Sequence, residues 1–92
     1  MIYEPAEDSF LLKKQLKNFI KKDMKVLDLG TGSGIQALEA KALGANVLAS
    51  DINPACVKHT NNLGIKTIQS NLFENIKGKF DLIIFNPPYL PE

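Results

Sequence analysis

The sequence predicts an α/β fold built on a parallel, doubly wound sheet with flanking helices. Short apolar runs of strand length alternate with segments of helical periodicity, which is the order expected of β-α-β units. Two of the helical segments are followed by a glycine suited to a left-handed cap, at Gly44 and Gly64. With 92 residues, 45% of them hydrophobic, the chain has the composition of one globular domain.

The expected elements follow the order α-β-α-β-α-β-β. An amphipathic helix is predicted over residues 7–20, because its apolar side chains recur at helical spacing. Two further helices are predicted at 35–43 and 54–63, and Asn53 and Pro54 give the second of these a side-chain cap and a favoured first residue. Strands are predicted for the apolar runs 26–29, 47–49, 65–68 and 80–85.

Charge and composition narrow the classes of function. The net charge is +1 and all eleven cationic residues are lysines, so the forked arginine contacts favoured for base and phosphate recognition are absent. The lysines that crowd residues 13–25 are interpreted as a solvated helix face, with a phosphate-binding patch as the alternative. No apolar run is long enough to span a membrane and no signal peptide is indicated, so a cytoplasmic location is expected.

The single cysteine and the single histidine receive structural interpretations. Cys56 is expected to be a buried small hydrophobe, since no partner for a nucleophile is evident. His59 is expected at the surface of its helix, because the sequence supplies no second histidine or cysteine cage for a metal. We therefore expect no metal site.

A glycine-rich segment, residues 28–34 with the sequence Asp-Leu-Gly-Thr-Gly-Ser-Gly, joins the first predicted strand to a helix. Glycines allow a tight turn and close approach of a ligand, and the free N–H groups at the helix start attract polar or anionic groups. A dinucleotide fingerprint needs G-x-G-x-x-G, but after Gly30 and Gly32 the third glycine, Gly34, comes one residue early. This spacing is instead typical of S-adenosylmethionine sites, with Asp28 as the negative charge for the ammonium group. Taken alone, a structural glycine turn is the alternative.

Polar residues follow the second and third predicted strands. Asp51 lies about 20 residues after the glycines, where an acid in this type of fold accepts two ribose hydroxyls. The alternative for Asp51 is an Asx turn leading into the Asn53 cap. After the third strand, Asn71 offers an oxygen to an adenine amino group and Leu72 an apolar cover for the ring.

The fourth predicted strand runs into Asn86-Pro87-Pro88-Tyr89. Proline has no N–H to continue pairing, so carbonyls are left available at the carboxyl edge, where ligands bind in open α/β sheets. The Asn86 carboxamide oxygen and the Pro87 carbonyl can accept the two hydrogens of an NH2 group, while Tyr89 stacks on a flat amide or base. The nitrogen lone pair then faces the sulfonium methyl for in-line transfer. A simple strand stop is the alternative.

Together, residues 3–12, 28–34, 51–54 and 86–89 resemble the HemK-related class I methyltransferases, and the opening segment is similar to their archaeal and eukaryotic branch. That family methylates the glutamine of the Gly-Gly-Gln motif in peptide chain release factors, and eukaryotic members have been proposed to act on lysine or on adenine in DNA. The resemblance implies a Rossmann-like fold with strand order 3-2-1-4 and target contacts from the segment 86–89. The cofactor contacts that it implies are Ser9, Asp28, Gly30, Asp51, Asn71 and Leu72.

The resemblance also implies an incomplete domain. The chain covers about half the family's usual length, so residues 1–92 are expected to form the S-adenosylmethionine-binding half without strands five to seven. The fourth strand would then lie on an open edge, which predicts a fragment, a truncated product or a split enzyme that self-associates when alone. Members of this branch commonly pair with a small zinc-binding activator at the sheet edge, here around residues 66–69. Asn71 replaces the family's usual acid, so a weaker adenine contact is implied.

Release factor glutamine N-methylation is therefore the leading prediction of function. A DNA adenine N6-methyltransferase is the first alternative, because adenine presents the same planar NH2 group, although the lack of arginine disfavours DNA. A non-catalytic cofactor-binding module is the second alternative.

Overall fold

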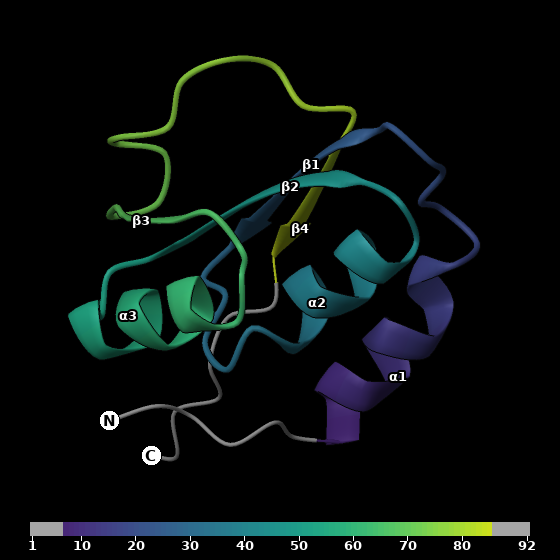
Figure 1. Cartoon of the computed structure of the whole chain (residues 1–92), viewed down its shortest axis with the longest axis horizontal. Coiled ribbons are helices and arrows are strands. Elements are labelled where there is room, and N and C mark those ends of the chain that lie inside the picture. Colours follow the sequence, from purple (N-terminus) through teal and green to yellow (C-terminus); the bar gives the residue numbers. More distant parts are fainter. Residues whose placement is uncertain (1–6, 86–92) are drawn as a thin grey trace.

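The structure is a computed structural model that describes residues 7–85, with side chains described from residue 11 onward. In this range the chain forms a parallel sheet in the order β3-β2-β1-β4, which confirms the predicted topology (Figure 1). The helices are α1 (Glu7–Leu16), α2 (Ile35–Ala42) and α3 (Pro54–Asn62). The strands are β1 (Lys25–Leu29), β2 (Asn46–Asp51), β3 (Thr67–Gln69) and β4 (Leu82–Phe85).

Several predicted boundaries were wrong, most clearly those of α1, β3 and β4. Helix α1 ends at Leu16, and a turn carries Ile20 back into the core while Phe19 stays exposed. Strand β3 begins at Thr67 because Ile65 is buried under the helices in the connection from α3. Pairing along β4 starts with the Asp81 N–H, which donates to the Lys25 carbonyl at 2.7 Å, and the strand itself begins at Leu82.

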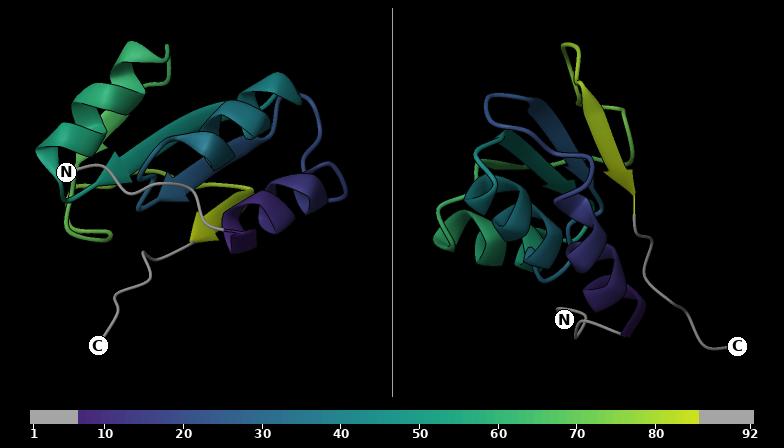
Figure 2. Two further views of the ribbon diagram at one scale, coloured as in Figure 1. Left: turned by 90° about the horizontal axis from the view of Figure 1, so that it is seen from below. Right: turned by 90° about the vertical axis from the view of Figure 1, so that its right-hand side faces the viewer.

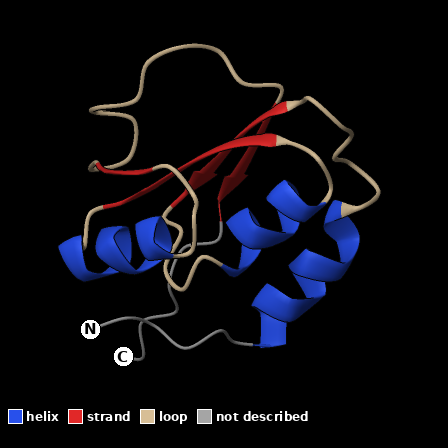
Figure 3. Ribbon diagram, in the orientation of Figure 1, coloured by secondary structure: helices blue, strands red, loops and turns tan. Residues whose placement is uncertain are grey.

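All three helices cover the same face of the sheet. In Figures 1 and 3 they lie below the strands, and the two further views in Figure 2 agree. Side chains of β1 and β4 that point to this face pack against α1 and α2 in one core cluster, and a second, smaller cluster lies under α2 and α3. The first cluster comprises Leu16, Ile20, Val26, Ala40, Ala45 and Ile84, and the second comprises Ala37, Ala49 and Ile65. The helices thereby fix one side of the sheet and the loops at its carboxyl edge.

The connection from β3 to β4, residues 70–81, crosses the opposite face. It must return past β2 and β1, and a right-handed crossover in that direction lies on the other side of the sheet. Doubly wound folds carry a helix there, whereas here the crossover is an irregular loop that arches over the strands (Figure 1). Because Ile84 faces the helices, Ile83 and Phe85 point to the opposite face, and they are 46% and 53% exposed.

Candidate functional site

The glycine loop, residues 30–34, leaves the carboxyl end of β1 and enters α2. Its first two N–H groups, those of Gly30 and Thr31, donate to the Ser50 carbonyl of β2 at 2.9 and 2.8 Å. The Gly34 N–H donates to the Thr31 carbonyl at 2.9 Å and closes the turn. The loop is therefore fastened across the ends of two adjacent parallel strands, at the edge where open α/β sheets bind ligands.

All three glycines of this loop have positive φ angles, of +74°, +58° and +84°, but Gly32 and Gly34 serve different purposes. A Cβ atom at Gly34 would lie 3.0 Å from Leu63 Cδ1 and 3.2 Å from Thr60 Oγ1, so this glycine permits close packing against α3. A Cβ atom at Gly32 would meet nothing within 4 Å. Gly32 therefore faces open space and is the glycine available to a ligand, whereas Gly34 is required by the fold.

The structure brings Asp51 to the glycine loop. Its Oδ2 accepts from the Gly32 N–H at 2.9 Å, and its Oδ1 accepts from the Asn53 N–H at 2.9 Å. The second bond is the Asx turn considered as an alternative, and Asn53 in turn caps α3 by accepting from the Ala55 N–H at 2.9 Å. Each carboxylate oxygen has two lone pairs, so both retain capacity for ligand hydroxyls. Loop support and ligand binding are thus compatible for this half-buried side chain.

Asp28 lies beneath the loop instead of on its surface. Its side chain is 1% exposed, and its Oδ2 accepts from the Thr31 hydroxyl at 2.8 Å. Burial is the largest cause that raises the pKa of this carboxyl from its ordinary value of 3.8 to about 6. Hydrogen bonds from Thr31 and from the Ala37 backbone lower the pKa, and the nearby charge of Asp51 raises it by a smaller amount. With a pKa of about 6, Asp28 is mostly ionised at neutral pH and then places a negative charge under the glycine loop.

A tight turn after β3 presents Asn71 and Leu72 at the same edge. The Ser70 N–H donates to the Asp51 carbonyl at 3.0 Å, and the buried Ser70 hydroxyl donates to the Leu72 carbonyl at 2.8 Å. Leu72 has a φ of +54°, which is costly for a branched side chain, and it is 55% exposed. A strained residue that holds an apolar side chain exposed, two residues after the contact between Ser70 and Asp51, is the pattern expected at a ligand clamp.

The remaining predicted site residues lie outside the described part of the chain. Ser9 belongs to α1, but its side chain is not among those described. The described range ends before Asn86, Pro87, Pro88 and Tyr89. It also begins after the opening segment, residues 1–6. Phe85 at the end of β4 pairs with Leu29, so β4 ends beside the residue that precedes the glycine loop.

The sequence prediction missed His59. This residue is half-buried, and its Nε2 lies 3.0 Å from the Ser33 carbonyl oxygen of the glycine loop. The sequence analysis expected His59 at the helix surface, and the structure adds that its side chain is half-buried against the glycine loop. Helical spacing carried a signal, because His59 is three residues after Cys56, which is fully buried. The burial of Cys56 confirms its predicted role as a small hydrophobe.

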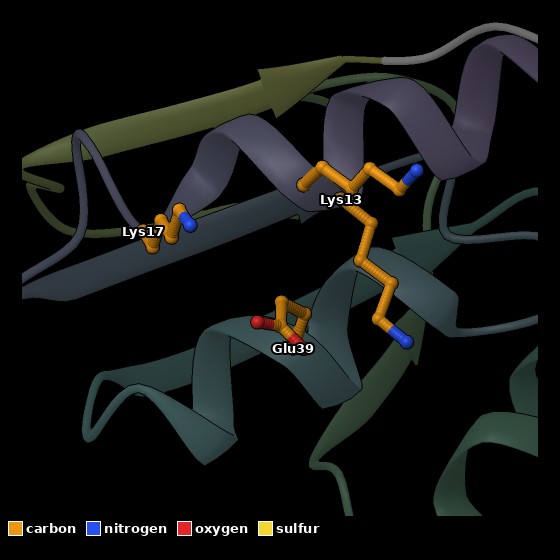
Figure 4. A pocket seen from close by; sticks show the side chains of 4 residues that line it. Lys13, Lys17 and Glu39 are labelled. Atoms are coloured by element: carbon orange, nitrogen blue, oxygen red, sulfur yellow. The ribbon is translucent and has the colours of Figure 1, made fainter.

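Lysines of α1 and of the turn that follows it border a shallow hollow of about 400 Å³ between α1 and α2 (Figure 4). Its lining residues are Lys13, Lys14, Lys17 and Glu39. None of the predicted site residues lines it, and the acid in its wall offsets part of the lysine charge. The solvated helix face stays a prediction. Among the side chains that the structure describes, those of residues 11–85, no three His, Cys, Asp or Glu gather as a metal site would require. None of the helices within residues 7–85 has the length and apolar character that a membrane span needs.

Comparisons with known proteins identify the family of the chain. The family described as the methyltransferase small domain matches residues 7–91. A protein of Methanocaldococcus jannaschii, provisionally named a protein N5-glutamine methyltransferase, is 47% identical over 97 residues that cover 98% of this chain and 48% of that protein. The methyltransferase HEMK2 of Mus musculus is 37% identical, covering 97% of this chain and 49% of that protein.

Solved structures agree with these sequence relatives. The Mtq2–Trm112 complex of E. cuniculi, described as responsible for methylation of the translation termination factor eRF1, matches with a TM-score of 0.84 and 30% identity. The match covers 98% of this chain and 54% of that one. A ribosomal protein L11 methylase of Lactobacillus delbrueckii matches with a TM-score of 0.79 and 28% identity, covering 92% of this chain and 56% of that one.

These matches agree with the loop geometry and with the strand order, which is that of class I methyltransferases. The chain spans about half the length of the curated relatives named above. Within that span the match runs through every described helix and strand. The chain therefore belongs to the methyltransferase small domain family.

Proposed function

We propose that this chain is the S-adenosylmethionine-binding half of an N-methyltransferase whose target is the glutamine of a release factor Gly-Gly-Gln motif. The observation that carries the cofactor part is the 2.9 Å bond between the Gly32 N–H and Asp51 Oδ2, which joins the open glycine of the loop to the acid of the next strand. The names of the M. jannaschii and E. cuniculi relatives support the target. Release factors act in the cytoplasm, which is where we place the reaction.

The residues at the carboxyl edge fit the parts of such a cofactor. Asp51 would accept the ribose hydroxyls with its remaining lone pairs, and Gly32 would let the ligand approach the backbone. The ionised Asp28 would attract the ammonium group through the loop, and Leu72 would cover the adenine, with Asn71 accepting from its amino group. Ser9, Gly30 and Gly34 complete the proposed set as contact or loop residues. When bound, the cofactor supplies an electrophilic methyl group on sulfur.

The segment 86–89 is proposed to position the target. Asn86 and Pro87 would accept the two amide hydrogens and Tyr89 would stack on the amide plane, while Pro88 keeps the segment from pairing as a strand. Positioning of the nitrogen lone pair is the main contribution asked of these residues. Incubating the complete enzyme with release factor and, separately, with duplex DNA tests the substrate, because methylation of DNA alone would reject the glutamine proposal.

The cofactor proposal predicts a large effect for Asp51→Asn. The substitution keeps the volume but removes the charge and one acceptor oxygen, and charge-assisted hydrogen bonds contribute about 1.5–3 kcal/mol. We expect the Kd for S-adenosylmethionine, measured by calorimetric titration, to rise about 10- to 100-fold. Asp81→Asn is the matched control, because Asp81 is an exposed acid at the opposite edge that accepts from the Lys25 N–H. Equal affinity of the two variants would contradict the assignment of Asp51.

The partners are also proposals. Within residues 7–85, strand β3 is one edge of the sheet. The E. cuniculi relative is a complex with Trm112, so this edge and that relative support a small zinc-binding activator that pairs beside β3. Strand β4 is the other edge, and a remaining half of the domain would cover it.

The open β4 edge predicts self-association of the purified chain. Ile83 and Phe85 are both about half exposed on this strand, and an apolar edge strand pairs readily with another chain. We expect Ile83→Lys to shift the sedimentation profile from dimers or larger species to monomer. Leu11→Lys is the control, since Leu11 is 51% exposed on α1. A wild-type chain that stays monomeric at high concentration would refute the prediction.

A further inference from the structure

We infer that His59 is a positioning residue that holds the glycine loop in its ligand-binding shape through the Ser33 carbonyl. The inference rests on the proposed cofactor site and adds to it a residue on α3. Its basis is the 3.0 Å separation between His59 Nε2 and the Ser33 oxygen, at a half-buried position. A carbonyl oxygen can only accept, so Nε2 carries the hydrogen in this contact.

This contact fixes one whole peptide plane. The Ser33 carbonyl and the Gly34 N–H belong to the same planar, trans peptide unit and point in opposite directions. His59 holds the carbonyl end, and the Thr31 carbonyl accepts from the Gly34 N–H at 2.9 Å. With both ends bonded, the plane cannot rotate without breaking a hydrogen bond. The two residues that flank Ser33 are Gly32 and Gly34, and a glycine backbone has more accessible conformations than that of any other residue.

Helix α3 reinforces this arrangement and links it to Asp51. The backbone of Gly34 sits against Thr60 and Leu63, which are one and four residues after His59. The other end of α3 is capped by Asn53, whose own N–H donates to Asp51 Oδ1. A single short helix thus contacts both the glycine loop and the acid proposed to bind ribose, and His59 is its polar contact with the loop.

The test compares two substitutions of His59 in the 92-residue chain. His59→Leu removes the donor, whereas His59→Gln places an amide nitrogen at a similar distance and should restore the bond. Lys58→Leu is the control, because Lys58 is the exposed neighbour on the same helix. Amide hydrogen exchange of Gly34 in the ligand-free protein and calorimetric affinity for S-adenosylmethionine are measured for each variant, with exchange at Leu27 in β1 as the internal reference.

We expect His59→Leu to accelerate Gly34 exchange about 3- to 10-fold beyond any change at Leu27, and to weaken cofactor binding by a similar factor, as the loss of one hydrogen bond implies. His59→Gln should return both values to within about twofold of wild type, a rescue that a purely structural role would not require. Equal acceleration at Gly34 and Leu27, or no change at Gly34, would overturn the inference. A wild-type chain that fails to bind the cofactor would reject the proposed function, while the exchange result would still decide the role of His59.

Discussion

Replacing Gly34 by alanine is expected to lower the free energy of unfolding by about 2–5 kcal/mol. The left-handed conformation at φ +84° costs a residue with a side chain about 1–2 kcal/mol. The new Cβ would also press on Leu63 Cδ1 at 3.0 Å and on Thr60 at 3.2 Å, and overpacking of this kind costs about 1–3 kcal/mol. Urea unfolding measures the loss as a lower midpoint at an unchanged slope.

Gly32→Ala is the matched comparison. Gly32 belongs to the same motif but faces open space, whereas Gly34 packs against Thr60 and Leu63. The φ of +58° still imposes about 1 kcal/mol, but the Cβ meets no atom within 4 Å. Stability should therefore fall only slightly, while affinity for S-adenosylmethionine falls at least about 30-fold because the methyl group fills the space needed by the ligand. If Gly32→Ala unfolded as readily as Gly34→Ala, or bound the cofactor as wild type does, the division of roles between the two glycines would be wrong.

The fold was predictable where local pattern and packing agree. The alternation of apolar runs with capped helices predicted each described element, and the resemblance supplied the strand order. Boundaries failed where an apolar residue serves the core without belonging to a strand or helix, as Ile65 and Ile20 do in connections. Periodicity detects that a residue is buried, but it does not tell whether that residue pairs in the sheet.

The candidate site, like the fold, was predictable from the sequence only in part. The proximity of Asp51 to the loop was predictable, since the ends of adjacent parallel strands meet at one edge. The separate roles of Gly32 and Gly34 were not, because they depend on where α3 packs. The contact between His59 and Ser33 spans 26 residues, and only the tertiary fold brings the two together.

Titration of Asp28 should lower the free energy of unfolding as the pH rises, which is the opposite of the usual effect of a carboxyl group. Burial raises its pKa from 3.8 to about 6, so the folded state holds this proton more tightly than the unfolded chain does. Compared with a side chain that does not titrate, Asp28 makes a constant contribution to the free energy of unfolding below pH 3.8. This contribution falls as the pH rises towards 6 and is constant again above that pH. Two pKa units correspond to about 3 kcal/mol, so wild type should lose about this much relative to Asp28→Asn between about pH 4 and pH 7.

Urea unfolding of both proteins across that range isolates the effect, because their difference removes the titration of the other carboxyls. Thr31→Val provides an independent check, since the Thr31 hydroxyl donates to Asp28 and lowers its pKa. Without this bond the pKa should rise further, and the loss of stability should extend to higher pH. Parallel pH profiles for wild type and Asp28→Asn would show that the carboxyl beneath the glycine loop is ionised without cost. Its negative charge would then be balanced by solvent or by loop dipoles, leaving less of its field to attract an ammonium group.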